Sequence, residues 1–415
     1  MGALTEQSLS EQTAMTAPFA ARATVSRLST WSGIVLFFAL AIVGLFYVKW
    51  SPYYAKAFVA AQDHMIGASI VSGKLAASPG VSLQAGFAYS IAYLKAIWQA
   101  LLLGLVLGAG IEALLPRVRL SQFFAGSKGP LRATAFAVPS MMCTCCCAPI
   151  AVGLIESGAA TSSALVYWLA NPVLNPAALV FIGFVLGWQW AALRLVVGVA
   201  LVFVVGDLAA RFVSPEWRPP GAPMRPDNAG KPFLLVWGRS FLRLTVRLIP
   251  EYVVLVFALG MVRAWLFPAM TPDIGHAIWL TTALAAAGTL FVIPTAGEVP
   301  IIQVLQQFGL GEAGAAALLV TLPAVSLPSL AMLGRALPIR AVLVLGFGTF
   351  VFGLVAAAAA KRWDFRNVSL FCAPHCYRCR TPSARLAKLS RSASTATIYP
   401  RRAWLSSGSS VFIRS

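Results

Sequence analysis

Long, unbroken runs of apolar residues constrain this chain more than any other feature. The clearest runs span residues 31–50, 91–115, 193–212, 248–267 and 341–360. A helix that crosses a bilayer needs about 20 predominantly apolar residues, whereas the strands of a membrane barrel alternate apolar and polar positions. Charged residues make up only 11% of the 415 residues, against roughly 25% in soluble domains. The sequence therefore predicts an all-α, polytopic integral membrane protein with about eight to ten helical segments.

The net charge of +19 follows from membrane topology rather than from a nucleic-acid partner. Residues 361–415 hold eleven Lys or Arg and a single acidic residue, and the other basic residues lie mainly between the apolar runs. Cytoplasmic loops of membrane proteins carry such residues. We expect contact with membrane lipid, no nucleic acid and no cofactor, in a multi-pass protein of the inner (plasma) membrane. The sequence leaves the oligomeric state open.

Shifts in composition divide the chain into segments. They are a cytoplasmic N-terminal segment (1–30), a first membrane helix (31–50), a first membrane repeat (86–212), a basic, Pro-rich linker (213–247), a second membrane repeat (248–360) and a basic, Ser/Arg-rich tail expected to be disordered (361–415). The linker is the natural divider between two halves, because it is the one long polar, Pro-rich stretch between apolar runs.

Prolines and glycines recur at matched intervals in the two halves. The matched positions are Pro149, Gly158, Pro172 and Pro176 in the first half and Pro300, Gly309, Pro323 and Pro328 in the second. In both halves the glycine lies nine positions after the first proline, and the next proline lies twenty-three positions after that same first proline. The pattern predicts an internal duplication with helices broken at these prolines, as in many secondary transporters. The alternative is that the prolines only kink continuous helices.

The predicted breaks bring polar side chains into apolar surroundings. Four cysteines crowd into residues 143–147, and counting back from the matched prolines makes Glu298 the equivalent of Cys147. The candidate substrate-binding residues are Cys143, Cys145, Cys146, Cys147, Asn171, Asn175, Glu298 and Ser326. We expect them to face one cavity, because backbone groups freed at a break cannot remain bare in lipid.

Thiol and carboxylate groups at this depth indicate specific chemistry. Thiolates are soft ligands that select copper(I), zinc and thiophilic elements, so Cys143 and Cys145 are candidate metal ligands. The alternative, strongest for Cys146 and Cys147, is that cysteine packs as a small hydrophobic residue. An ionisable group inside a membrane segment is a functional candidate by default, and Glu298 would either carry a proton or provide a fixed charge.

Basic residues also predict the topology. Arg22 and Arg27 place the N-terminus in the cytoplasm, and the basic stretches 117–132 and 218–247 belong on the same side. Three apolar stretches separate these two loops, so one of the three must fail to cross. We expect the cysteine stretch to form a re-entrant or broken hairpin, which makes the repeats inverted. If all three stretches cross, the repeats are parallel and the linker lies outside.

The residues at the breaks resemble a known family, the predicted permeases of the ArsP/YraQ type. The motif comprises Cys143-Thr144-Cys145, Pro149-Ile150-Ala151, Gly158, Asn171-Pro172 and Asn175-Pro176, and the resemblance covers about residues 31–360. Members are described as efflux permeases for trivalent organoarsenicals, and relatives as candidate copper or zinc exporters. The resemblance therefore implies a permease without fixing its substrate. Here Cys146 stands where the family has glycine, and Cys147 adds a thiol.

Three classes of function are compatible with these features. The first is export of a thiophilic metal or metalloid species, such as a trivalent arsenical or a soft metal ion, by alternating access. The sequence has no ATP-binding motif of the G-x-x-x-x-G-K-[ST] kind, so coupling would use protons or another ion. The second is an intramembrane thiol oxidoreductase using Cys145 and Cys146, which is disfavoured because adjacent cysteines rarely reach disulfide geometry. The third is a membrane-embedded binding subunit without transport. We expect a transporter rather than an enzyme.

Overall fold

The computed structural model describes residues 32–65, 82–114, 122–214, 217, 233–266 and 277–363. These residues belong to one compact unit, and every regular element among them is a helix. The all-α prediction is therefore confirmed for the described residues. The N-terminal segment 1–30, and the predicted tail 361–415 from residue 364 onward, lie outside them.

The first membrane helix is longer than predicted, because it runs from Ser32 to Asp63 rather than ending at residue 50. It contains a π-helical turn, η1 (Phe46–Trp50), which is followed by α2 (Ser51–Asp63). Pro52 lies in the first turn of α2, where its ring would clash with a carbonyl of the preceding turn in a regular helix. The wider π-helical turn accommodates the proline.

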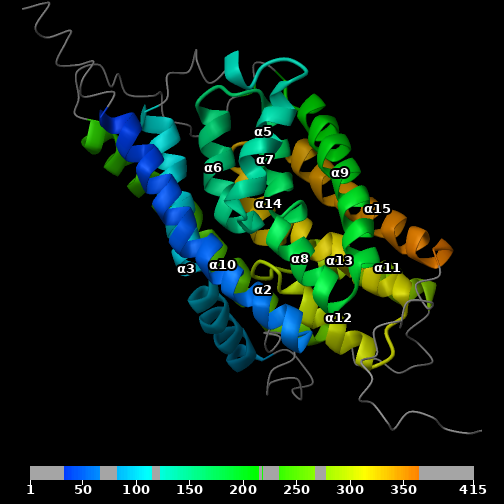
Figure 1. Ribbon diagram of the computed structural model, residues 1–415. Coiled ribbons are helices and arrows are strands. Elements are labelled where there is room, and N and C mark those ends of the chain that lie inside the picture. The colour runs from blue at the N-terminus through cyan, green and yellow to red at the C-terminus, as the bar shows by residue number, and fades with distance from the viewer. Residues whose placement is uncertain are drawn as a thin grey trace, which may run out of the picture. The chain divides into compact units, whose positions relative to one another are not determined.

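Among the described residues, the helices before and after the linker follow the same order (Figure 1). The first half comprises α3 (Leu83–Leu114), α5 (Gly129–Ser140), α6 (Thr144–Glu156), α7 (Thr161–Val173), α8 (Pro176–Val185) and α9 (Trp188–Arg211). The second comprises α10 (Phe233–Leu266), α11 (Ile278–Leu290), α12 (Glu298–Gln307), α13 (Glu312–Ala324), α14 (Leu327–Gly334) and α15 (Ile339–Arg362). In each half a long helix is followed by two pairs of short helices and a second long helix.

Two predicted boundaries need correction at the linker. Helix α10 begins at Phe233, so residues 233–247 are helical and do not belong to a linker of 213–247. The second half accordingly starts before residue 248. The physical reason is that the arginines of this stretch are spaced along one amphipathic helix, whereas its prolines all precede residue 233.

Three of the prolines predicted to break helices lie inside them. Pro149 lies within α6, and Pro172 and Pro323 lie just before the last residues of α7 and α13. A proline removes one backbone hydrogen bond, which a buried membrane helix tolerates. The breaks within the short-helix pairs instead span residues 141–143, 174–175, 291–297 and 325–326.

The other three prolines start helices. Pro176, Pro300 and Pro328 lie in the first turns of α8, α12 and α14. An N–H in the first turn has no partner within the helix, so proline is favoured there. These prolines therefore mark the residues at which the chain resumes a helix after a break.

Helices α5 and α6 form a hairpin that enters and leaves at the same end. The hydroxyl of Ser163, in the first turn of α7, donates to the carbonyl of Phe124, just before α5, at 2.7 Å. The start of α5 therefore lies beside the start of α7 (Figure 1). The two helices have 12 and 13 residues, against about 20 needed to cross a bilayer. This is the geometry expected of a re-entrant hairpin.

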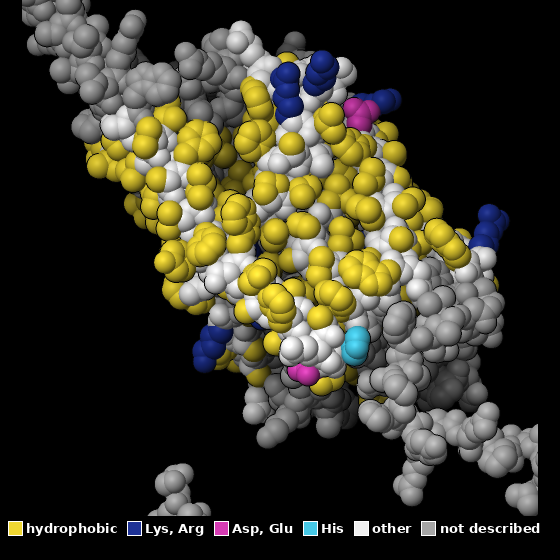
Figure 2. Space-filling model, viewed as in Figure 1, with side chains coloured by type: hydrophobic (Ala, Val, Ile, Leu, Met, Phe, Trp, Pro, Cys, Tyr) yellow, Lys and Arg dark blue, Asp and Glu magenta, His cyan; other side chains and the backbone are white. Residues whose placement is uncertain are grey.

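The outer surface of the bundle is suited to lipid. Seven helical stretches among the described residues are long and apolar enough to cross a membrane. Large apolar side chains cover them, and Val246 and Phe347 are 65% and 68% exposed. Figure 2 shows hydrophobic side chains over most of one face, with the charged ones near its edges. The prediction of a multi-pass membrane protein is confirmed.

Helices α3 and α6 cross so closely that glycine is needed at the crossing. A Cβ atom on Gly104 of α3 would lie 1.9 Å from the carbonyl oxygen of Cys146. A Cβ atom on Gly108 would lie 2.6 Å from that of Pro149. Backbone atoms cannot rotate away as side chains do, so these glycines fix α3 against the cysteine segment.

The variant Gly104→Ala should lower the free energy of unfolding by about 1–3 kcal/mol, because α3 must move away from Cys146. Gly238→Ala in α10 is the matched control, since its added Cβ would meet no atom within 4 Å. Unfolding of both variants in detergent measures the difference. Equal stability of the two variants would show that the crossing does not depend on glycine.

Candidate functional site

Asn171, a buried residue of α7, supports the break between α5 and α6. Its side-chain oxygen accepts hydrogen bonds from the Ser140 hydroxyl and from the Met142 N–H, the latter at 3.3 Å. Its amide group donates to the Tyr167 carbonyl at 3.0 Å. Met141 ends α5 in the left-handed conformation, with a φ of 49°. The side chain of Asn171 therefore uses its hydrogen bonds to stabilise the break between α5 and α6.

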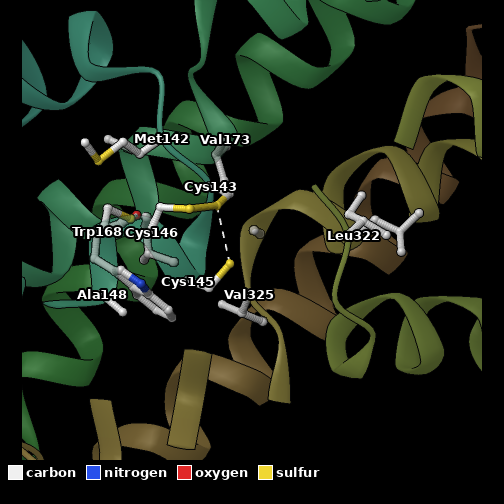
Figure 3. Close-up of a cluster of buried hydrophobic side chains, with 14 of the residues drawn as sticks. Met142, Cys143, Cys145, Cys146, Ala148, Trp168, Val173, Leu322 and Val325 are labelled. Atoms are coloured by element: carbon white, nitrogen blue, oxygen red, sulfur yellow. Dashed lines mark hydrogen bonds between the residues drawn. A yellow bond between two sulfur atoms is a disulfide. The ribbon is translucent and has the colours of Figure 1, made fainter. Parts of the chain in front are cut away.

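Three cysteines meet at the start of α6. The Sγ atoms of Cys143, Cys145 and Cys146 lie within 4.8 Å of one another, and all three residues are buried. Cys143 and Cys146 form a disulfide, and the Cys145 Sγ lies 3.3 Å from that of Cys143 (Figure 3). We call these three residues the sulfur cluster. The disulfide has a Cys-x-x-Cys spacing, which is visible in the sequence. The thiol pair considered from the sequence, Cys145 and Cys146, is therefore wrong.

Cys147 points away from the sulfur cluster. Its thiol donates to the carbonyls of Thr144 and Trp168, each at 3.5 Å. The indole N–H of Trp168 donates to the same Thr144 carbonyl at 2.9 Å. Cys147 therefore packs between α6 and α7 and adds no sulfur to the cluster.

Two tyrosines on one face of α3 connect the sulfur cluster to the second half. The Tyr93 hydroxyl lies 3.1 Å from the Cys145 Sγ, and its ring stacks on that of Tyr89 with the centroids 5.9 Å apart. The Tyr89 hydroxyl donates to the carbonyl of Val292, in the break before α12. Neither tyrosine was predicted from the sequence, although residues four apart share one helix face.

Glu298 begins α12 and forms a buried ion pair with Arg194 of α9, in which the two side chains are 0% and 1% exposed. Arg194 also donates to the carbonyls of Pro172 at 2.7 Å and Val173 at 3.2 Å, which are freed where α7 ends. The pair therefore ties the start of α12 to the end of α7 and joins the two halves. The sequence indicated Glu298, and Arg194 is likewise an ionisable residue within an apolar run, but nothing in the sequence pairs two residues 104 positions apart.

Asn175 and Ser326 cap the second helix of a broken pair in each half. The Asn175 side chain accepts from the N–H groups of Ala177 at 3.0 Å and Ala178 at 3.2 Å. The Ser326 N–H donates to the Ser329 hydroxyl at 3.0 Å, as in a capping box. Such caps satisfy N–H groups that a helix start leaves unpaired. Both residues lie at the breaks, with helix starts rather than the sulfur cluster as their partners.

The breaks of the two halves come together around these groups. Val173, at the end of α7, and Val325, directly after α13, lie around the sulfur cluster in Figure 3. A cavity of about 310 Å³ borders the break before α12 and is also lined by Tyr89. The site therefore consists of a buried sulfur cluster in the first half and a cavity at the facing break of the second half.

Broken helix pairs that meet around buried polar groups, within a bundle of membrane-spanning helices, form the architecture of a membrane permease. A family model described as a predicted permease, of the ArsP type, matches residues 82–216. The UPF0718 protein YraQ of Escherichia coli (strain K12) is 44% identical over 334 residues, which cover 80% of this chain and 95% of the relative. No solved structure matches the chain. The chain belongs to the ArsP/YraQ-type family of predicted permeases.

Membership of this family confirms the resemblance found in the motifs. It makes the protein a transporter rather than an enzyme, and the thiol oxidoreductase alternative is accordingly set aside.

Proposed function

We propose that this permease exports a thiophilic metal or metalloid species, a trivalent arsenical or a soft metal ion. The observation that carries the proposal is the sulfur cluster, whose three buried Sγ atoms lie within 4.8 Å of one another. After reduction of the Cys143–Cys146 disulfide, three thiolates can surround one soft ion or one arsenic(III) atom. Among the described residues, the candidate ligands in this cluster are all sulfur atoms. Such a ligand set disfavours hard ions such as magnesium.

We further propose that the two halves are inverted repeats with a common ancestor. Their movement relative to each other would open the site to each side of the membrane in turn. Glu112 of α3 pairs with Arg243 of α10 at 2.8 Å, and Glu156 of α6 pairs with Arg247 at 3.0 Å. Both pairs lie where α3 and α6 end, whereas the cavity reaches Lys56 in α2, toward the opposite end. This arrangement supports a state that is closed by ion pairs at one end, which must separate for access from that end.

Transport into inside-out vesicles of the inner (plasma) membrane tests the proposal. Vesicles containing the protein should accumulate phenylarsenous acid, and vesicles with the Cys143→Ser/Cys145→Ser variant should not. Binding without accumulation would favour the alternative of a membrane-embedded binding subunit. Failure to bind or accumulate trivalent arsenicals, copper(I) and zinc would overturn the thiophilic substrate.

The proposed topology places the N-terminus and the end of α3 in the cytoplasm. Exposed Asp63, at the end of the first helix, and exposed Ser127, just before α5, then lie on opposite sides. In a chain without the tail cysteines Cys372, Cys376 and Cys379, an impermeant maleimide should label Asp63→Cys in intact cells and Ser127→Cys only after lysis. Ready labelling of Ser127→Cys in intact cells would rule out this topology.

A further inference from the structure

The cavity beside the break before α12 contains a buried lysine. The cavity has a volume of about 310 Å³ and lies between the first membrane helix, α3, α8 and the residues around the start of α12. Lys49, in the π-helical turn of the first helix, lines it and is only 5% exposed. A π-helical turn often occurs at functional sites, because it moves side chains out of the regular helical register.

The immediate partners of the Lys49 ammonium are neutral. It donates to the Thr295 hydroxyl at 3.3 Å and to the Tyr53 hydroxyl at 3.4 Å, and it lies 5.4 Å from the centre of the Tyr53 ring. These hydrogen bonds are long and leave room for an additional, shorter partner. Thr295 belongs to the break before α12, so the lysine lies directly against the proposed transport site.

Lys49 differs in this respect from the other buried cation. Arg194 pairs with the carboxylate of Glu298 in the bundle interior. No carboxylate of the described residues forms an ion pair with Lys49. A buried charge inside a membrane is costly unless it is paired, so a lysine left with neutral neighbours marks a place where an anion binds.

Two tyrosines connect the cavity that holds the lysine to the sulfur cluster. Tyr89 lines the cavity, and its stacked neighbour Tyr93 lies 3.1 Å from the Cys145 Sγ. The two buried tyrosines therefore lie between the cavity and the sulfur cluster.

We propose that the cavity is an anion-binding subsite in which Lys49 and Thr295 receive a carboxylate group of the transported molecule. The substrate is then a thiophilic species with a negatively charged substituent, held by its soft atom at the sulfur cluster and by its anion at the lysine. This inference rests on the proposed function for the thiophilic end of the substrate, whereas the subsite itself rests on the cavity and on Lys49.

Equilibrium binding of two matched arsenicals to the purified, reduced protein tests the proposal. Phenylarsenous acid carries no charged substituent, and 4-carboxyphenylarsenous acid adds only the carboxylate. The wild type should bind the carboxylated compound on the order of tenfold more tightly, as expected for a buried charge-assisted hydrogen bond. Lys49→Gln should abolish this preference, so that the two compounds bind with equal affinity. Lys49→Arg should retain the preference.

Controls separate the subsite from general effects of charge and folding. Lys95→Gln removes an exposed lysine of α3 outside the cavity and should keep the preference. Lys49→Met is a second variant of similar length, used if Lys49→Gln does not fold. Equal affinities of the wild type for the two arsenicals, or a preference that survives both substitutions, would overturn the subsite.

If neither arsenical binds, the proposed substrate class fails and benzoate alone decides the subsite. Benzoate should raise the midpoint of thermal unfolding of the wild type, because a ligand stabilises the state that it binds. It should not do so for Lys49→Gln or Lys49→Met. No rise in the wild type would overturn the subsite independently of the sulfur chemistry.

Discussion

Replacing Arg194 by methionine should lower the free energy of unfolding by about 3–5 kcal/mol. The substitution leaves the buried Glu298 carboxylate without its cation and removes the donors to the carbonyls of Pro172 and Val173. An isolated buried charge is much less favourable than the absence of both charges. The double variant Arg194→Met/Glu298→Met should therefore recover part of the loss.

Arg211→Met is the matched control for this experiment. The Arg211–Asp207 pair is exposed, with side chains 73% and 54% accessible, and surface pairs of this kind contribute about 0–1 kcal/mol. Unfolding by SDS in mixed micelles measures all the variants. Equal losses for Arg194→Met and Arg211→Met, or no recovery in the double variant, would contradict a structural role for the buried pair.

Replacing Cys143 and Cys145 together by serine should abolish resistance to trivalent arsenicals and weaken binding by about 100-fold, since one sulfur of the cluster remains. Growth of an arsenical-sensitive host, with the amount of protein in the membrane determined in parallel, measures the effect. Full resistance of the double variant would mean that the cysteines serve packing alone.

Cys147→Ser is the matched control for the thiols. Cys147 lies outside the sulfur cluster, and a serine hydroxyl can still donate to the carbonyls of Thr144 and Trp168. This variant should keep resistance near the level of the wild type. A loss as large as that of the double variant would show that the structure assigns the wrong cysteines to the site.

The class of fold could be predicted from the sequence because lipid constrains every spanning helix in the same way. Long apolar runs, basic loops and the crowded cysteines at residues 143–147 are local features, and each of them is visible without tertiary information. The positions of the breaks could be predicted less well. Pro149 was predicted to break the chain and lies inside α6, because one missing N–H does not end a helix that is packed on both sides.

The roles of some buried charged residues depend on distant partners, which could not be predicted from the sequence. Lys49 contacts Thr295 across 246 positions, and Arg194 meets Glu298 across 104. A lysine near the end of an apolar run is normally expected to extend toward the membrane surface. Here the π-helical turn before Pro52 directs Lys49 inward instead. Contacts over such separations cannot be predicted from any spacing in the sequence.

X-ray absorption spectroscopy of the reduced protein loaded with phenylarsenous acid tests the central claim most directly. The sulfur cluster predicts an arsenic atom bound to its phenyl carbon and to sulfur, with oxygen ligands replaced by thiolates of Cys143, Cys145 or Cys146. Cys147→Ser should leave this spectrum unchanged, and Cys143→Ser/Cys145→Ser should lose sulfur neighbours. Arsenic that keeps only oxygen and carbon neighbours in the wild type would contradict the account.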